Sequence, residues 1–233
     1  MNLYLSVKDS PWREQDPSKV LADTEFDAVR PKLLAKHTHN DGSLYCHHCN
    51  NMTKVSEKAK QGFFDIHHLD DDHSNNDWQK NLALLCPFCH MVYHIGFYCM
   101  TGRAFLVYAP EIPQIAISRL SFSVCLTVDM DKPTKLATCI SQQYASLAEQ
   151  RLLLDSRLGK EASINIANML MDVRTNTPPE EWPKKQKELV GDLRIVPYLE
   201  HQDWVRHVDY WRGVHANRVK NFTNKLEAQV ATG

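Results

Sequence analysis

The sequence predicts an α+β protein in which a small metal-binding module precedes a mainly α-helical region. Two observations lead to this class. Two CxxC pairs stand on either side of a short, histidine-rich, strand-like segment, and from residue 109 onwards the apolar side chains recur at helical spacing over long stretches. The chain has 233 residues, of which 43% are hydrophobic, so it can bury one large core or two small ones.

The first predicted segment, residues 1–36, holds one short strand and one helix. The run LYLSV at residues 3–7 indicates a strand that ends at a polar turn. A helix is predicted over residues 24–35, where the apolar positions recur at helical spacing. Pro31 is expected to kink this helix or to begin its second part, because proline lacks a backbone N–H.

The second segment, residues 37–108, is predicted to be the metal module. Its order is a CxxC turn, a strand over FFDIHH at residues 63–68, a polar loop, and a helix that begins near Cys86 or Pro87. Strand, loop and helix therefore follow one another around the candidate ligands.

The third segment, residues 109–233, is predicted to be a helical region packed on the module. Pro133 is expected to separate its first two helices, and Gly159 suits the C-terminal cap of the second. Aromatic positions of the last helix, Trp204 and Trp211, either face the core or offer a partner surface. The helices are predicted at residues 112–128, 134–158, 162–173, 178–193 and 202–230.

Four cysteines form the strongest candidate metal site. They stand in two CxxC pairs, Cys46 with Cys49 and Cys86 with Cys89. Four thiolates at about 2.3 Å from one ion make a closed, tetrahedral, structural zinc site. We therefore predict that zinc stabilises the module. The leftover cysteines are expected to be buried core thiols, and these are Cys99, Cys125 and Cys139.

The chain is expected to be cytoplasmic, without membrane insertion. No apolar run approaches the roughly 20 residues that cross a bilayer, and the polar N-terminal stretch lacks the apolar centre of a signal peptide. Cysteines in such a chain are expected to be metal ligands or reduced thiols, because cytosolic disulfides are rare.

The charge balance argues against strong binding of nucleic acid by the whole chain. Lysine and arginine number 27 and aspartate and glutamate 28, which gives a formal net charge of -1. Proteins that bind DNA by neutralising phosphates carry a basic excess or stripe. Several aspartates also surround the histidine-rich segment, so its surface is expected to be acidic. They are Asp65, Asp70, Asp71, Asp72 and Asp77.

A set of histidines and one asparagine indicates a second site. His67 and His68 end the predicted strand, and Asn81 lies beyond the loop that follows. His90 and His94 are spaced i, i+4, which places them on one helical face. In this order and spacing, the module resembles the HNH, or ββα-metal, endonucleases.

That resemblance implies a role for each residue. His67, His90 and His94 would bind a divalent ion such as Mg²⁺ or Mn²⁺, which polarises the scissile phosphate. His68 would be the general base that deprotonates the attacking water, and Asn81 would fix the loop or complete the coordination. The alternative is that the histidines remain from an ancestral site that no longer cleaves DNA.

A second resemblance covers almost the whole chain. SVKDSPWRE near the N-terminus, LDDDHSNND and NLALLCPFC in the module, GRAFLVYAPEIPQ and LRIVP are similar to the DotN/IcmJ family of Dot/Icm type IVB secretion and conjugation systems. The resemblance implies a cytosolic adaptor, recruited to the inner-membrane secretion apparatus, that binds a segment of the coupling-protein ATPase (DotL-like). Members of that family keep the cysteines and have lost most catalytic histidines, whereas this sequence keeps both. Adaptor and DNA endonuclease therefore both remain open.

Overall fold

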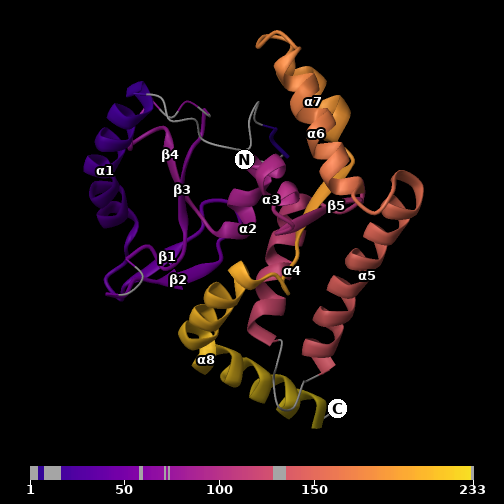
Figure 1. The fold of residues 1–233 in the computed structure, drawn as a ribbon. Coiled ribbons are helices and arrows are strands. Elements are labelled where there is room, and N and C mark those ends of the chain that lie inside the picture. Colours follow the sequence, from indigo (N-terminus) through magenta and orange to yellow (C-terminus); the bar gives the residue numbers. More distant parts are fainter. Residues whose placement is uncertain are drawn as a thin grey trace.

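A computed structural model describes residues 5–7, 17–57, 60–70, 72, 74–127 and 135–231. It confirms the α+β class: helices dominate, and the described strands pair into three separate two-stranded antiparallel sheets (Figure 1). No helix of the described residues has the length and apolar character that crossing a membrane requires.

The N-terminal part differs from the prediction in two ways. Helix α1 (Pro17–His37) is longer than expected and continues through Pro31. The predicted strand at residues 3–7 is wrong where it is described, since Leu5, Ser6 and Val7 form no strand. Ser6 instead donates its backbone N–H to the carbonyl of Val92, at 2.8 Å, which ties this segment to the metal module.

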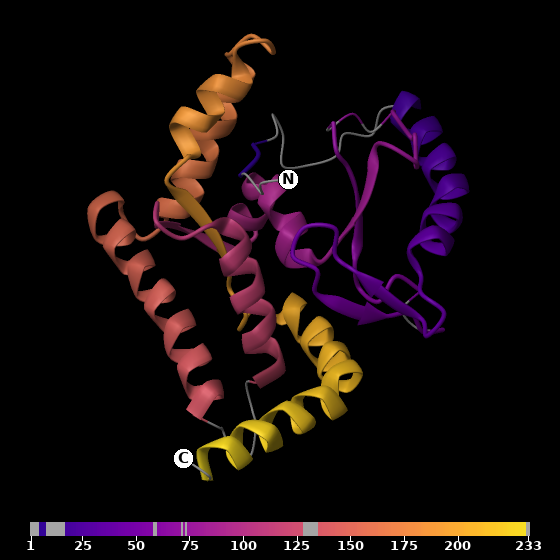
Figure 2. The same ribbon diagram turned by 180° about the vertical axis from the view of Figure 1, so that it is seen from behind.

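The metal module is built from two hairpins and a broken helix. Strands β1 (Ser43–Tyr45) and β2 (Met52–Lys54) pair around the first CxxC turn. Strand β3 (Asp65–His68) pairs with β4 (Leu82–Leu85), and α1 runs along the outer side of this second hairpin in both views (Figure 1, Figure 2).

Directly after β4 the chain turns into the helical part of the module. Helix α2 (Pro87–His90) begins with a proline at its first position, where no N–H is needed. It continues into the 3₁₀ turn η1 (Met91–Tyr93) and then α3 (Ile95–Met100). The predicted strand, loop and helix order is therefore confirmed.

The third segment contains the predicted helices and one strand that was not predicted. Gly159 ends α5 with φ +91°, a conformation that glycine adopts without strain, as expected. The predicted break at Pro133 lies outside the described residues. The helices are α4 (Gln114–Thr127), α5 (Lys135–Leu158), α6 (Ala162–Thr175), α7 (Trp182–Val190) and α8 (Gln202–Ala231).

The missed strand is β6 (Leu193–Pro197), which pairs with β5 (Ala104–Tyr108) across a long stretch of sequence. Side chains occupy the outer edges of both strands. The Gln114 amide exchanges two hydrogen bonds, each 2.9 Å, with the backbone of Ile195. The Ser163 hydroxyl accepts from the N–H of Leu106 at 2.9 Å. These groups oppose the addition of a further strand at these positions.

One aromatic cluster joins the metal module to the helical region. Helix α4 contacts α5 on one side and α8 on the other (Figure 1). Phe88 of α2 lies 5.2 Å from Trp204 and 5.5 Å from Trp211 of α8, and Phe122 of α4 lies 4.9 Å from Trp211, between ring centroids. Both tryptophans are buried, so the core interpretation of α8 is confirmed, and α8 holds α2 in place.

Candidate metal centres

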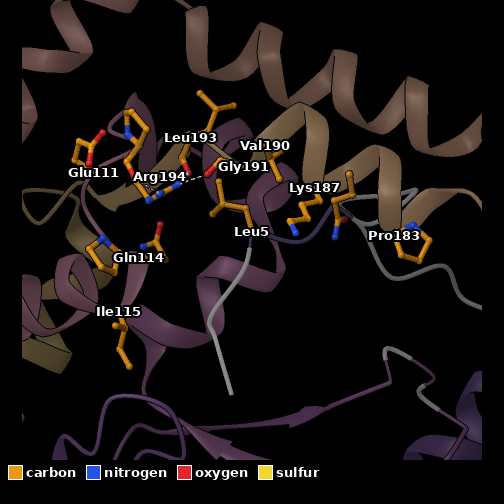
Figure 3. Close-up of a pocket in the computed structure, with 13 residues that line it drawn as sticks. Leu5, Glu111, Gln114, Ile115, Pro183, Lys187, Val190, Gly191, Leu193 and Arg194 are labelled. Atoms are coloured by element: carbon orange, nitrogen blue, oxygen red, sulfur yellow. Dashed lines mark hydrogen bonds between the residues drawn. The ribbon is translucent and has the colours of Figure 1, made fainter.

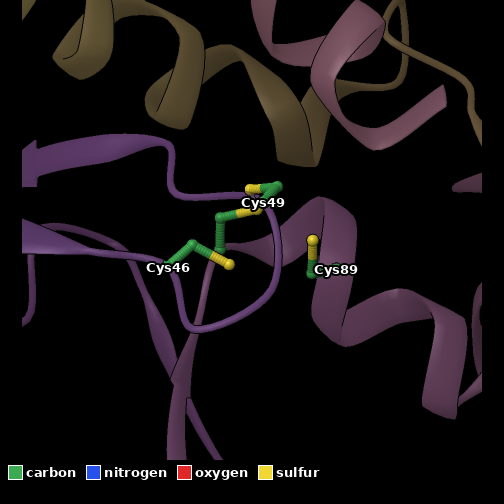
Figure 4. Close-up of side chains that lie close together, drawn as sticks. Cys46, Cys49 and Cys89 are labelled. Carbon is green, nitrogen blue, oxygen red and sulfur yellow. Dashed lines mark hydrogen bonds between the residues drawn. The ribbon is translucent and has the colours of Figure 1, made fainter. Parts of the chain in front are cut away.

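The four predicted zinc ligands come together in one buried cluster, here called the four-cysteine centre. Cys46 and Cys49 come from the turn between β1 and β2, and Cys86 and Cys89 from the start of α2 (Figure 4). Their sulfur atoms lie within 4.8 Å of one another. All four residues are buried. Thiolate sulfurs at this separation can hold one zinc ion.

The chemistry of these thiols supports a cation among them. Hydrogen bonds from the neighbouring thiols, that of Cys49 first, hold the pKa of Cys46 well below its usual range. Burial raises the pKa of Cys86, and the hydrogen bond with Cys46 raises that of Cys89. Without a cation the cluster therefore favours negative charge at Cys46 over Cys86 and Cys89. A bound dication would supply the charge that allows Cys86 and Cys89 to ionise.

The helical region also holds the first CxxC turn directly. Arg119 of α4 donates from Nε to the carbonyl of Cys49 at 3.1 Å. His47, inside the turn, donates its backbone N–H to the carbonyl of Leu84 in β4 at 2.9 Å. The turn is thus fixed from two sides, which keeps its cysteines facing α2.

Three of the predicted histidines form a second cluster, the three-histidine centre. His67 of β3, His90 at the end of α2 and His94 just after η1 have ligand atoms within 4.8 Å of one another. The Nε2 atoms of His90 and His94 are 3.1 Å apart. The change from α to 3₁₀ geometry between them does not separate the two rings, whose centroids lie 4.6 Å apart. The predicted pairing of strand and helix histidines is therefore present.

An acidic neighbour that the sequence reasoning did not assign supports cation binding there. The Oδ2 atom of Asp65 lies 3.4 Å from Nδ1 of His90. A carboxylate beside the far nitrogen of a ligating imidazole orients the ring and makes it a better ligand. Three imidazole nitrogens suit a transition metal such as zinc better than magnesium, which prefers oxygen ligands. The residues present fit one such ion.

His68, the predicted general base, lies outside this cluster. Successive strand residues point to opposite faces, so His68 points away from His67. Its Nε2 atom lies 2.9 Å from Oδ1 of Asn76, and its ring centroid is 5.5 Å from that of Phe26 in α1. Only 5% of His68 is exposed. The loop and α1 therefore cover it.

Asn81 fixes the loop between β3 and β4. Its Oδ1 accepts from the N–H of Asp70 at 3.1 Å, and its Nδ2 donates to Asp70 Oδ1 and to the carbonyl of Asn75, each at 2.8 Å. Of the two roles left open for this residue, the geometry fits the loop-fixing one.

Two further residues near the centres were not predicted as site residues. The ring of Tyr93 stacks on His67, with centroids 4.1 Å apart and an interplanar angle of 26°. Its hydroxyl lies 2.7 Å from Nε2 of His48, a residue inside the first CxxC turn. No local pattern marks such a contact, because Tyr93 and His48 are far apart in the chain.

A pocket of about 760 Å³ lies outside both centres, in the helical region (Figure 3). Its wall combines apolar side chains with a few charged ones, of which Arg194 is held by the carbonyls of Pro110 and Gly191. The residues that line it include Leu5, Ile115, Pro183, Lys187, Val190 and Leu193.

Fold and site together define a class: an α+β protein with a four-cysteine centre that could hold zinc and an adjoining cluster of three histidines. No protein-family model matches the sequence, and no curated protein matches it. Any more particular function therefore has to be argued from the residues themselves.

Proposed function

We propose that this chain is a zinc-stabilised cytosolic adaptor subunit of a type IVB secretion or conjugation coupling complex. The resemblance to the DotN/IcmJ family supports it, because the similar stretches run from the N-terminal segment to β6. Helices α4 to α8 also support it, since a ββα-metal nuclease module does not require them.

The observation that favours an adaptor over a nuclease is that His68 is covered by other side chains. A general base must lie within hydrogen-bond reach of the proton that it takes. Here the Nε2 atom of His68 is engaged by Asn76, and Phe26 of α1 packs against its ring. A phosphodiester could reach it only if the loop and α1 moved away. The near-zero net charge also disfavours DNA as the partner.

The partner in this proposal is an extended segment of the coupling ATPase, and the pocket in Figure 3 is its candidate binding site. The pocket offers apolar contact through Ile115 and Pro183 and charged contact through Lys187. Side chains occupy the edges of β5 and β6, so the segment would bind through pockets for its side chains rather than as an added strand.

The test is binding of the purified chain to the cytosolic part of the coupling ATPase from the same secretion system. We expect a stable one-to-one complex that Ile115→Glu weakens at least tenfold. Leu152→Glu, a matched change at an apolar side chain on α5 that is 64% exposed, is expected to bind normally. His94→Ala is also expected to bind normally, because the adaptor does not depend on a second metal. A wild-type chain that forms no complex would overturn the proposal.

A second candidate is an active, metal-dependent HNH DNA endonuclease. The convergence of His67, His90 and His94, with Asp65 beside His90, favours it. When bound, the ion would polarise the scissile phosphate. His68 would take the proton of the attacking water once the loop had opened, and Asn81 would hold that loop.

This candidate predicts plasmid cleavage that depends on added magnesium, manganese or zinc. His68→Ala and His94→Ala would each abolish the cleavage while the protein keeps its zinc and its melting curve. Tyr45→Phe, a change in the same module but outside the histidine cluster, is the matched control. An unchanged cleavage rate in His68→Ala excludes the nuclease.

A further inference from the structure

The four-cysteine and three-histidine centres are joined by one short stretch of chain. Cys86 directly precedes α2, Cys89 and His90 lie on α2, and His94 directly follows η1. The backbone N–H of His90 donates to the carbonyl of Cys86 at 2.9 Å. A ligand of one centre therefore anchors a ligand of the other.

A second connection runs through Tyr93. His48 lies inside the first CxxC turn, and its Nε2 atom is 2.7 Å from the Tyr93 hydroxyl. The Tyr93 ring then stacks on His67 at 4.1 Å between centroids, and His94 is the next residue in the chain. Tyr93 thus touches the turn that carries two cysteines and borders two of the three histidines.

We propose that Tyr93 is a positioning residue that couples the two metal centres, so that zinc in the four-cysteine centre raises the affinity of the three-histidine centre for its own ion. The proposal rests on metal binding at both clusters. It does not depend on whether the chain is an adaptor or a nuclease.

The physical basis is preorganisation. Zinc would restrain the first CxxC turn beyond the hydrogen bonds of Arg119 and His47, because the ion would link this turn to Cys86 and Cys89. With the turn fixed, the hydrogen bond between His48 and Tyr93 restrains the Tyr93 ring, and the ring restrains His67 against His90 and His94. The second ion then meets ligands that are already ordered, and less binding free energy is lost in ordering them.

Such coupling is reciprocal, so an ion in the three-histidine centre must also strengthen zinc binding at the cysteines by the same factor. Loss of the hydrogen bond between His48 and Tyr93 is expected to lower the affinity of the three-histidine centre for its ion roughly fivefold. Loss of the stacked ring as well is expected to lower it further, by roughly tenfold or more in total.

The experiment uses the full chain with zinc in the four-cysteine centre and adds cobalt as the probe of the three-histidine centre. Cobalt bound by imidazoles shows visible d–d absorption without thiolate charge-transfer bands, which identifies the centre that is filled. Dissociation constants are measured for the wild type, Tyr93→Phe, Tyr93→Leu and the matched control Tyr45→Phe. Zinc content and the melting curve of each variant are checked first.

We expect Tyr93→Phe to bind cobalt roughly fivefold more weakly than the wild type and Tyr93→Leu more weakly still, with Tyr45→Phe unchanged. In competition with a zinc chelator, cobalt should raise the zinc affinity of the wild type and raise it less in Tyr93→Phe. His48→Leu should act like Tyr93→Phe, and the double variant should lose no more than the larger single effect, because both remove one hydrogen bond.

The outcomes are distinguishable. If neither the wild type nor His94→Ala binds cobalt outside the four-cysteine centre, the three-histidine centre and the coupling are both wrong. If the wild type binds cobalt there and Tyr93→Phe matches it in both measurements, the coupling alone is wrong. Independent effects of His48→Leu and Tyr93→Phe that simply add would also overturn it.

Discussion

Replacing Cys46 and Cys86 together by serine is expected to unfold the metal module. Each substitution removes one thiolate from a different CxxC pair, so neither half of the cluster keeps two ligands. The two hairpins around the site have strands of only three or four residues. Isolated two-stranded hairpins of this kind are marginal in water, so the module depends on its other contacts.

The magnitude follows from comparing two free energies. A structural zinc ion binds with about 10 to 16 kcal/mol at neutral pH, whereas a whole domain is stable by only about 5 to 15 kcal/mol. Contacts of Phe88 with the α8 tryptophans remain in the variant. They cannot offset the loss of the ion, because a fully buried large apolar side chain contributes about 3 kcal/mol at most.

The assays are elemental analysis for zinc and thermal unfolding followed by circular dichroism. We expect the double variant to lack the zinc ion that the four-cysteine centre of the wild type holds, and to show an early unfolding transition that addition of zinc does not reverse. Cys99→Ser is the control matched for burial, because Cys99 is a buried thiol outside the cluster. A double variant that stays folded with an unchanged melting curve would refute the structural role of zinc.

Four further predictions concern stability and reactivity. Gly62→Ala should destabilise the fold more than Gly102→Ala. Both glycines have positive φ, but only at Gly62 would a Cβ lie 2.5 Å from a neighbouring side chain. Equal melting temperatures of the two variants would contradict this. Trp211→Ala should cost about 3 to 5 kcal/mol in chemical denaturation, since this side chain of α8 is fully buried against Phe88 of α2 and Phe122 of α4. A loss under 1 kcal/mol would contradict this. Burial raises the pKa of Cys99 to about 12, so at pH 8 the exposed Cys139 should be alkylated first, as read by mass spectrometry. In the folded state the Cys99 thiol stays protonated up to about pH 12, whereas in the unfolded chain it ionises near pH 8.5. The contribution of Cys99 to stability is therefore fully present below about pH 8. Above that pH the unfolding free energy falls by ~1.4 kcal/mol per pH unit, up to about pH 12. A flat stability profile over that range would contradict the shift.

Local patterns were the reliable part of the sequence reasoning about the fold. The helices after residue 109 were found because their apolar residues repeat at helical spacing, and Gly159 because a positive φ at a helix end favours glycine. Strand β6 was missed because a short strand is defined by its partner, and β5 lies far away in the chain. The strand predicted at residues 3–7 was wrong over the described residues 5–7, because Val7 and Ser6 bond to α7 and η1 instead of to a sheet.

The prediction of buried leftover cysteines was correct for Cys99 and Cys125 and wrong for Cys139. All three lie on helices, and composition alone does not say which helical face a residue occupies. Cys139 is on a solvent-facing part of α5, which packs on β5 and α4 with its other face. The role of each cysteine outside the CxxC pairs was therefore decided by packing.

For the candidate site, the sequence by itself determined which residues can meet. The spacing of a CxxC turn brings two thiols together, and the i, i+4 spacing brings His90 beside His94, because both follow from the local geometry of the chain. Only the tertiary structure decided that α1 covers His68 and that His48 meets Tyr93 across the module. Those contacts join separate elements, and their free energy depends on how the elements pack, which no local spacing encodes.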